Sequence, residues 1–164
     1  MARSAELRDD ELLIDKMFDA PAALVFRLWS DPAHFVRWWG PKGFTNPVVE
    51  LDLRPGGRWY HVMRGPDGRD YPADSEFIEV TPPERIVYRN RQLDDAVFAD
   101  NPPPSFLRVI TLEALPGNRT RLTLEAYFDT AANKGAVIRR GFREGVLESF
   151  DKLTAHLATR GGTP

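Results

Sequence analysis

The chain has 164 residues, of which 42% are hydrophobic and 28% are charged. This length and this balance indicate one globular domain with its own hydrophobic core, and they exclude a disordered or membrane-embedded chain. The formal net charge of −2 and the scattered arginines argue against a nucleic-acid-binding protein, so we expect no nucleic-acid partner.

The N-terminal part predicts a short tail and then a strand. Residues 1–10 are polar and are expected to be flexible, and residues 11–160 are expected to form a single domain. Mixed polar and apolar residues from Leu12 to Phe18 predict the first strand. No apolar run is long enough for a signal peptide or a membrane span, so we expect a cytoplasmic protein without membrane insertion.

Two short helices are predicted directly after this strand. Pro21 suits the first turn of the first helix, whose apolar residues recur at spacings of three and four. The second helix is expected to begin at Asp31, as its N-cap, and Pro32, and to end at Gly40-Pro41.

A strand-rich region follows from residue 46 to residue 92. Turns rich in Gly and Pro divide it at residues 55–57, 65–68 and 81–84. The segments between the turns are about 5 to 10 residues long and contain many β-branched and aromatic residues, as in an antiparallel meander. A polar loop with three prolines, Leu93 to Ser105, separates this region from the last strands.

The last two strands are predicted at Phe106–Leu115 and Thr120–Phe128. Apolar and polar residues alternate clearly from Leu122 to Phe128, which is typical of a strand with one buried face. The pattern leaves open whether the apolar face or the face with Glu125 and Tyr127 lines an interior cavity. The same question stays open for residues 73–80.

A single long helix is predicted from Ala132 to Thr159. Its apolar residues recur at intervals of three and four, and at 1.5 Å per residue it would be about 40 Å long. Seven antiparallel strands cannot stay flat, so the sheet is expected to curl around this helix. The predicted fold is therefore α+β, with a seven-stranded curved antiparallel sheet around a long C-terminal helix and two short helices after the first strand.

Linked motifs give the chain a family resemblance. In chain order they are Asp-Ala-Pro, Trp-Ser-Asp-Pro, Trp-Trp-Gly-Pro, Pro-Gly-Gly-Arg-Trp, Gly-Pro-Asp-Gly and Pro-Pro-Glu-Arg. The segment from Leu12 to His156 resembles the bacterial proteins named after the C-terminal domain of the activator of heat-shock protein 90 ATPase. These proteins belong to the START-like, Bet v 1-like (SRPBCC) superfamily. The resemblance implies a helix-grip fold, which is the architecture that the element order predicts independently.

The resemblance implies function less sharply, because the superfamily includes carriers of lipids and hormones, cyclases and aromatases, toxin-sequestering proteins and chaperone activators. We expect binding of a small apolar or aromatic molecule between the sheet and the C-terminal helix. The alternatives are a cyclase- or aromatase-type enzyme that uses the same cavity, and an interaction module that modulates a chaperone ATPase. The eukaryotic activator carries a further N-terminal domain for chaperone docking, for which 164 residues leave no space, so a chaperone partner is not our first expectation.

The candidate ligand-binding residues combine apolar and aromatic side chains with a few polar ones, the usual composition of a small-molecule pocket. Gly40–Phe44 and the loop of residues 93–105 are expected at its mouth. In the Trp-Trp doublet, Trp38 is expected to be structural and Trp39 to lie at this mouth. The predicted cavity residues are Trp39, Phe44, Trp59, His61, Met63, Tyr88, Arg108, Tyr127, Phe142 and Val146.

Of the three histidines, His61 is the one expected to face the cavity, because it shares a strand face with Trp59 and Met63. Either a ligand contact or proton-transfer role, or a satisfied position in the wall, fits this placement. His34 is expected on the solvent side of its helix, and His156 near the end of the last helix, where a partly charged imidazole suits the helix dipole.

The sequence carries no pattern for metal or nucleophilic catalysis. Cysteine is absent, the histidines lack metal-ligand spacing, and there is no Gly-x-Ser-x-Gly motif, so we predict no catalytic residue, no metal site and no cofactor. A homodimer is compatible with the sequence, but no exposed apolar stripe demands one.

Overall fold

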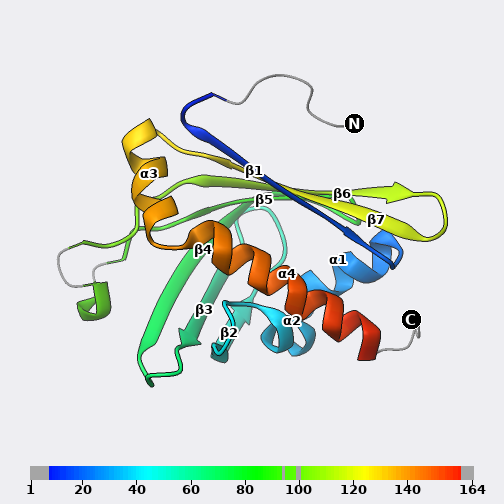
Figure 1. Ribbon diagram of the computed structural model, residues 1–164, viewed down its shortest axis with the longest axis horizontal. Helices are drawn as coiled ribbons and strands as arrows, with labels where there is room; N and C mark the ends of the chain where they lie inside the picture. The colour runs from blue at the N-terminus through cyan, green and yellow to red at the C-terminus, as the bar shows by residue number, and fades with distance from the viewer. Residues whose placement is uncertain (1–7, 94, 99–100, 160–164) are drawn as a thin grey trace.

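The computed structural model describes residues 8–93, 95–98 and 101–159 (Figure 1). Most of the tail predicted to be flexible, residues 1–7, lies outside these ranges. The elements in chain order are β1 (Glu11–Phe18), α1 (Ala22–Ser30), α2 (Pro32–Trp38), β2 (Thr45–Leu51), β3 (Arg58–Arg64), β4 (Asp70–Thr81), β5 (Arg85–Asn90), the 3₁₀ helix η1 (Ala96–Phe98), β6 (Leu107–Leu115), β7 (Arg119–Tyr127), α3 (Ala131–Arg139) and α4 (Phe142–Thr159).

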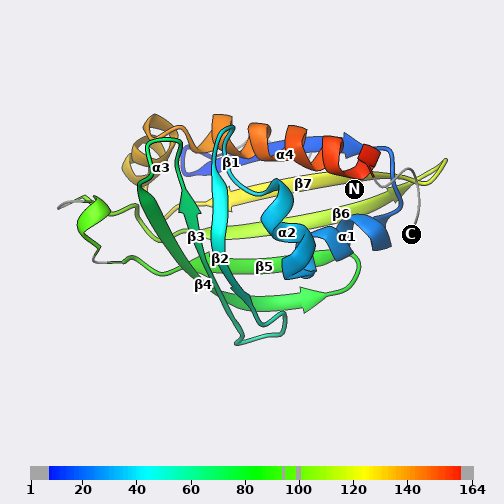
Figure 2. The same cartoon turned by 90° about the horizontal axis from the view of Figure 1, so that it is seen from below.

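The strands form one seven-stranded antiparallel sheet in the order β1-β7-β6-β5-β4-β3-β2. The sheet is strongly curved, since β2, β3 and β4 bend away from the direction of β1, β6 and β7 (Figures 1 and 2). Helix α4 crosses the concave side, while α1 and α2 cover it at one end (Figure 2). This arrangement confirms the predicted fold class.

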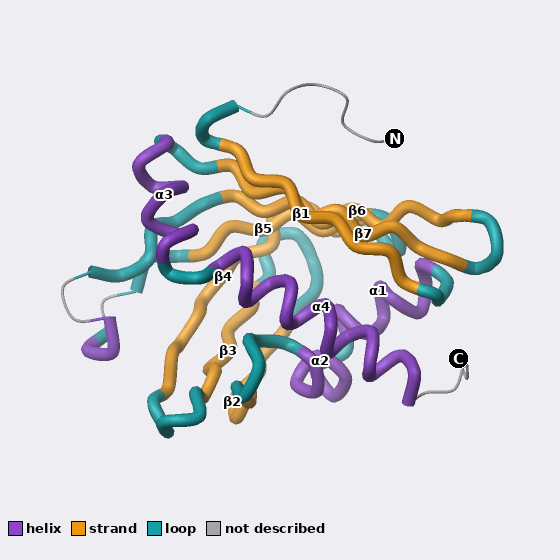
Figure 3. Tube along the Cα trace, in the orientation of Figure 1, coloured by secondary structure: helices purple, strands orange, loops and turns teal. Residues whose placement is uncertain are grey.

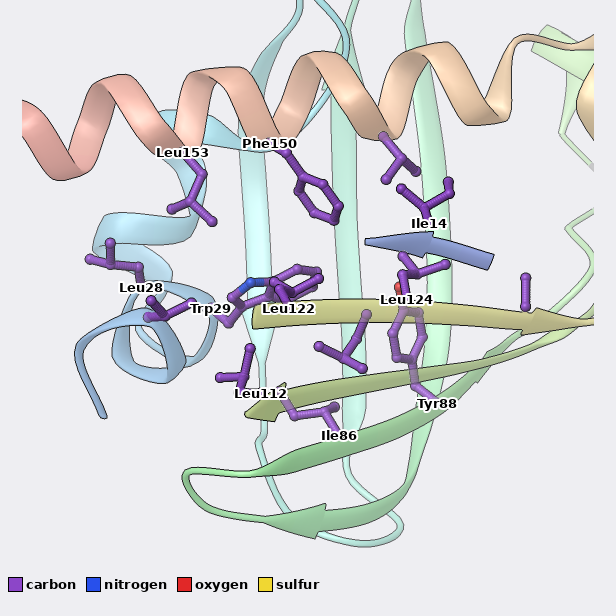
Figure 4. Close-up of a cluster of buried hydrophobic side chains, with 14 of the residues drawn as sticks. Ile14, Leu28, Trp29, Ile86, Tyr88, Leu112, Leu122, Leu124, Phe150 and Leu153 are labelled. Atoms are coloured by element: carbon purple, nitrogen blue, oxygen red, sulfur yellow. The ribbon is translucent and has the colours of Figure 1, made fainter. Parts of the chain in front are cut away.

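Strand β7 shows which face of the sheet is buried. Thr120, Leu122, Leu124 and Ala126 are buried, and the residues between them are half-buried on the opposite face. Leu124 pairs with Ile110 on β6 and with Ile14 on β1, so one apolar layer crosses three strands. Phe150 and Leu153 of α4 point toward this layer (Figure 4). The apolar face therefore faces α4, which settles the alternative that the alternation left open.

The C-terminal helix is not continuous, as predicted, from Ala132 to Thr159. Gly141 has a φ of +86°, in the left-handed region, which separates α3 from α4. The N–H groups of Arg140 and Gly141 donate to the carbonyl groups of Val137 and Ile138 and close the end of α3. The predicted stripe of apolar residues is present, and all of its residues lie on α4.

Helix α2 begins as predicted, because the side chain of Asp31 accepts a hydrogen bond from the N–H of Ala33 at 3.0 Å. It ends about two turns later at Trp38, and Gly40 follows with a φ of +100°. The loop from Trp39 to Phe44 then leads into β2 (Figure 3). None of the helices among the described residues has the length and the apolar character that crossing a membrane requires.

Candidate functional site

The inner face of the sheet carries an aromatic cluster centred on Trp59 of β3. The indole of Trp59 stacks on the ring of Phe77 at 5.6 Å between centroids and contacts Tyr88 edge-on at 4.8 Å. Helix α2 and its C-cap add Phe35 and Trp39, whose rings lie 5.1 and 5.7 Å from that of Trp59. Strand alternation places these side chains on one face, and α2 covers them from above.

His61 lies beside Trp59 and is only 5% exposed. The indole Nε1 of Trp39 donates a hydrogen bond to Nε2 of His61 at 3.1 Å. Because Nε2 accepts, the proton of the neutral imidazole resides on Nδ1. Burial, and secondly the charge of Arg108, lower the pKa of His61 to about 3. At neutral pH His61 is therefore an uncharged hydrogen-bond donor through Nδ1.

Three buried donors in this region lack a hydrogen-bond partner among the described residues. One is the indole Nε1 of Trp29, whose ring lies 6.4 Å from that of Trp59. The other two are the Nδ1 of His61 and the indole Nε1 of Trp59, whose rings lie 5.6 Å apart. Leaving a buried donor unsatisfied costs about 1–3 kcal/mol, so native proteins rarely keep such groups without a reason. An acceptor supplied from outside the chain would satisfy the donors of His61 and Trp59.

Arg108 of β6 places a cation on the inner face. It pairs with Tyr88 on β5 and with Ala126 on β7 in the register of the sheet. Its guanidinium lies 3.7 Å above the ring of Phe106, and its Nη1 donates to Oδ1 of Asn90 at 2.9 Å. Burial lowers the pKa of Arg108. Burial likewise raises the pKa of the neighbouring Tyr88.

The cluster has a rim of half-buried aromatic side chains. Phe44, after α2, lies 6.1 Å from Tyr71 at the start of β4, and Tyr71 lies 6.5 Å from Phe98 of η1. Phe142, at the start of α4, contacts Phe106 edge-on at 5.3 Å. These side chains come from four separate segments and are the exposed edge of the aromatic interior.

The loop from Trp39 to Phe44 is fastened to α4 by polar contacts. The buried N–H of Gly40 donates to Oγ of Ser149 at 3.0 Å, and the N–H of Lys42 donates to Oε1 of Glu148 at 3.0 Å. The ammonium group of Lys152 donates to the carbonyl oxygen of Gly40 at 3.2 Å. Burial lowers the pKa of Lys152, and the charge of Glu148 opposes this shift. These contacts hold Trp39 against His61.

Replacing Ser149 with alanine is expected to lower the free energy of unfolding by about 1–3 kcal/mol, because the N–H of Gly40 would stay buried without a partner. Thr154→Ala is the matched control on the same helix: its exposed hydroxyl donates only to the carbonyl of Phe150, and a change within about 0.5 kcal/mol is expected. Urea unfolding followed by circular dichroism measures both. Equal effects would contradict the fastening role of Ser149.

The family model described as Activator of Hsp90 ATPase homolog 1-like protein matches residues 19–158. The chain belongs to this family. A comparison with curated proteins finds no match. The resemblance seen in the linked motifs is therefore confirmed over nearly the whole chain.

Solved structures similar to this family member support the same fold. A protein from Nitrosomonas europaea is 27% identical, with a TM-score of 0.82, 93% of this chain covered and 97% of that one. A protein from Mycobacterium smegmatis is 30% identical, with a TM-score of 0.80 and 92% of each chain covered. The AHSA1 protein from Silicibacter pomeroyi is 26% identical, with a TM-score of 0.75, 92% of this chain covered and 99% of that one.

Most of the predicted cavity residues lie on the concave side of the sheet. Trp39, Trp59, His61 and Tyr88 form the aromatic cluster, and Arg108 is next to Tyr88. Phe44, Met63 and Phe142 are half-buried, and Val146 is buried on α4. Met63 lies beside Gly40, the residue after Trp39.

Tyr127 is the exception, and its prediction was wrong. Its hydroxyl donates to Oε2 of Glu125 at 2.7 Å on the opposite face of the sheet from Leu124 and Ala126. His34 was also wrongly expected to face solvent, since it is half-buried, with its Nδ1 3.2 Å from Nε2 of His156.

The sequence did not single out several residues of the site. Phe77 and Phe106 supply rings to it, Asn90 binds Arg108, and Tyr71 joins the rim. Phe77 and Tyr71 share one face of β4, but the residues between them on that face, Ala73 and Ser75, are small and give no apolar period. No local pattern marks Asn90, because its role depends on a partner 18 residues away.

Two surface hollows lie elsewhere. One, with a volume of about 310 Å³, is lined by the β1–α1 turn, α1 and Leu157 of α4, and the other is next to residues 8–10 and Ala131. None of the predicted cavity residues lines either hollow. Among the described residues, no group of three or more histidine, aspartate or glutamate side chains is placed to hold a metal ion.

Proposed function

We propose that the chain binds a small molecule with an apolar or aromatic body between the inner face of β3–β6 and helix α4. The observation that carries the proposal is the pair of buried donors, Nδ1 of His61 and Nε1 of Trp59, for which the described part of the chain offers no hydrogen-bond partner. A core built only for stability would pair these groups or replace them with apolar ones. A ligand with an acceptor atom satisfies them and buries its apolar body against the surrounding rings.

Entry is proposed at the rim. Phe44, Tyr71, Phe98 and Phe142 are half-buried and belong to loops or to the ends of elements, so they can move aside without unpairing the sheet. The fully buried rings of Phe77, on the sheet, and of Phe35, on α2, enclose the interior from opposite sides. Apolar burial contributes about 25 cal/mol per Å² of surface removed from water, which is the main driving force for such a ligand.

Binding is favoured over the cyclase- or aromatase-type reaction in the same place. Such an enzyme needs a general base whose pKa lies near the working pH. The pKa of His61 is lowered to about 3. His61 is therefore a hydrogen-bond donor to a ligand rather than a group that removes its proton.

A neutral fluorescent probe tests the proposal. Nile red is expected to bind the purified protein with a blue-shifted, enhanced emission, and native mass spectrometry is expected to detect the one-to-one complex. Replacing the rim residue Tyr71 with aspartate should weaken binding at least several-fold, because a charge would be placed where the apolar body enters. Tyr60→Asp, on the other face of the neighbouring strand, is the matched control and should leave binding unchanged.

Nile red that binds the native protein and both variants equally would place the dye on another surface and overturn the proposal. Absence of any binding, by fluorescence and by mass, would overturn it as well.

A further inference from the structure

We propose that the ligand carries one carboxylate group at the end of its apolar or aromatic body, and that Arg108 is the counter-ion of this carboxylate. The inference deepens the proposed function and rests on it. It assigns Arg108 a role in ligand binding. The donor groups of His61 and Trp59 lie on the same inner face of the sheet.

The first support is the missing counter-ion. Among the described residues, no carboxylate lies within ion-pair distance of Arg108. Within the described ranges, the one hydrogen bond of its guanidinium goes to the neutral amide oxygen of Asn90. Arginines on the outer face of the sheet do pair with carboxylates: Arg58 contacts Asp74 at 2.9 Å, and Arg85 contacts Glu79 at 3.1 Å. Taking a cation out of water without an anion is costly, so an unpaired guanidinium on the inner face points to an anion from outside the chain.

The second support is the way in which Arg108 is held. The guanidinium lies over the ring of Phe106 at 3.7 Å, and the rings of Tyr88 and Phe142 lie 5.3 and 5.5 Å from its Cζ. The N–H groups of a guanidinium lie in one plane and form a fork-shaped set of donors. A guanidinium stacked on a ring keeps these donors parallel to the ring, where they can meet an acceptor. Asn90 accepts from Nη1 alone. Among the described residues the remaining N–H groups of the fork have no acceptor, and a fork of this kind matches the two oxygens of a carboxylate.

The neighbour of Arg108 in the register is Ala126 of β7, a small side chain that is fully buried on the same face. On the other side, Tyr88 contacts Trp59 at 4.8 Å, and Trp59 contacts His61 at 5.6 Å. The cation and the two unpaired donors are thus connected through adjacent rings on one face.

The third support is the positive and donor character of this surface. Arg108, His61 and Trp59 present only donors, and the charge of Arg108 contributes to the lowered pKa of His61. Such a surface favours an anion and opposes an ammonium group. One guanidinium balances one negative charge, so a monocarboxylate fits better than a phosphate monoester, which carries up to two charges near neutral pH.

The test compares acids with uncharged isosteres on the whole protein. The probe pairs are 2-naphthoate with 2-naphthamide, and dodecanoate with dodecanamide, measured by displacement of Nile red at pH 7. The native protein is expected to bind at least one acid about 10-fold or more tightly than its amide, as for a hydrogen bond between charged groups.

Arg108→Met removes the charge and keeps an unbranched apolar stem. It is expected to weaken binding of the acid about 10- to 100-fold and to change the affinity for the amide by less than about threefold. Arg85→Met is the matched control, since Arg85 lies on the adjacent strand β5 with its side chain on the outer face, and it should keep the preference for the acid.

A native protein that binds Nile red but shows no preference for the acid in either pair overturns the inference and leaves the proposed function standing. Failure of Nile red and of every probe to bind overturns both. The native measurement decides even if Arg108→Met does not fold. In that case Arg108→Lys, which keeps the charge without the fork, should retain part of the preference, and an unchanged preference in a folded Arg108→Met variant would also reject the inference.

Discussion

Replacing Trp38 with alanine is expected to lower the free energy of unfolding by about 3–5 kcal/mol. Trp38 is completely buried, and its Nε1 donates to the carbonyl oxygen of Leu28 at 3.0 Å. Its ring packs edge-on against Trp29 at 4.9 Å and Phe35 at 5.5 Å. Alanine would leave a cavity between α1 and α2 and an unpaired carbonyl group, and α2 is too short to persist without this contact.

Urea unfolding at pH 7, followed by far-ultraviolet circular dichroism, measures the loss. Arg37→Ala, the exposed neighbour on α2, is the control and should change the free energy of unfolding by less than about 0.5 kcal/mol. Trp39→Phe, which keeps a ring and loses the hydrogen bond to His61, should cost about 1–2 kcal/mol. A loss below 1 kcal/mol for Trp38→Ala would contradict its structural role.

The two tryptophans show how far local sequence reasoning reaches. The short helix before Gly40 required burial to persist, and this predicted that Trp38 would be structural, as its complete burial confirms. Trp39 follows the helix, and its indole is half-buried against Trp59 and His61. Its hydrogen-bond partner, His61, is 22 residues away on β3, and no local period encodes such a contact.

The alternation on β7 predicted a strand but not the direction of its faces. Thr123, Glu125 and Tyr127 carry polar groups, and a ligand cavity also needs polar groups, so composition alone allowed either face inward. The register decides, because Leu124 lies between Ile110 and Ile14 in a layer that α4 covers. Tyr127 is consequently excluded from the interior, whereas Arg108 is included because it shares a face with Ile110.

The break between α3 and α4 depends on one backbone angle. Glycine occurs in helix interiors as well as at helix ends, so Gly141 alone did not distinguish a weak point from a break. The apolar residues gave only a partial indication: the predicted stripe begins at Phe142, but Val137 of α3 is buried as well. The contact between His34 and His156 joins residues 122 positions apart, and it depends on how α2 packs on α4.

The free energy of unfolding is expected to fall as the pH falls from about 6.5 toward 3, and His61 is expected to be the main cause in the upper part of this range. In the unfolded chain its imidazole binds a proton near its ordinary pKa of about 6.5. In the folded protein burial keeps it neutral until pH about 3. Between the two values the unfolded state binds more protons, so stability decreases as the pH decreases.

The slope for one such group is about 1.4 kcal/mol per pH unit, or about 2–3 kcal/mol between pH 6.5 and 4.5. His61→Phe keeps an aromatic ring without a proton to bind, so its stability should fall less over the same range. The difference between the two proteins isolates His61, because His34, His156 and the carboxylates are common to both. Urea unfolding at half-unit pH steps measures it, and parallel curves would contradict burial of a neutral imidazole.

A bound carboxylate changes this expectation in a defined direction. An anion beside Arg108 offsets the positive charge that lowers the pKa of His61, and it stabilises the protonated imidazole. The pH dependence of the native protein should therefore become shallower between pH 6.5 and 4.5 when a saturating acid is present, whereas the corresponding amide should leave the slope unchanged. His61→Phe should show the same slope with either probe, since it has no imidazole for the anion to act on.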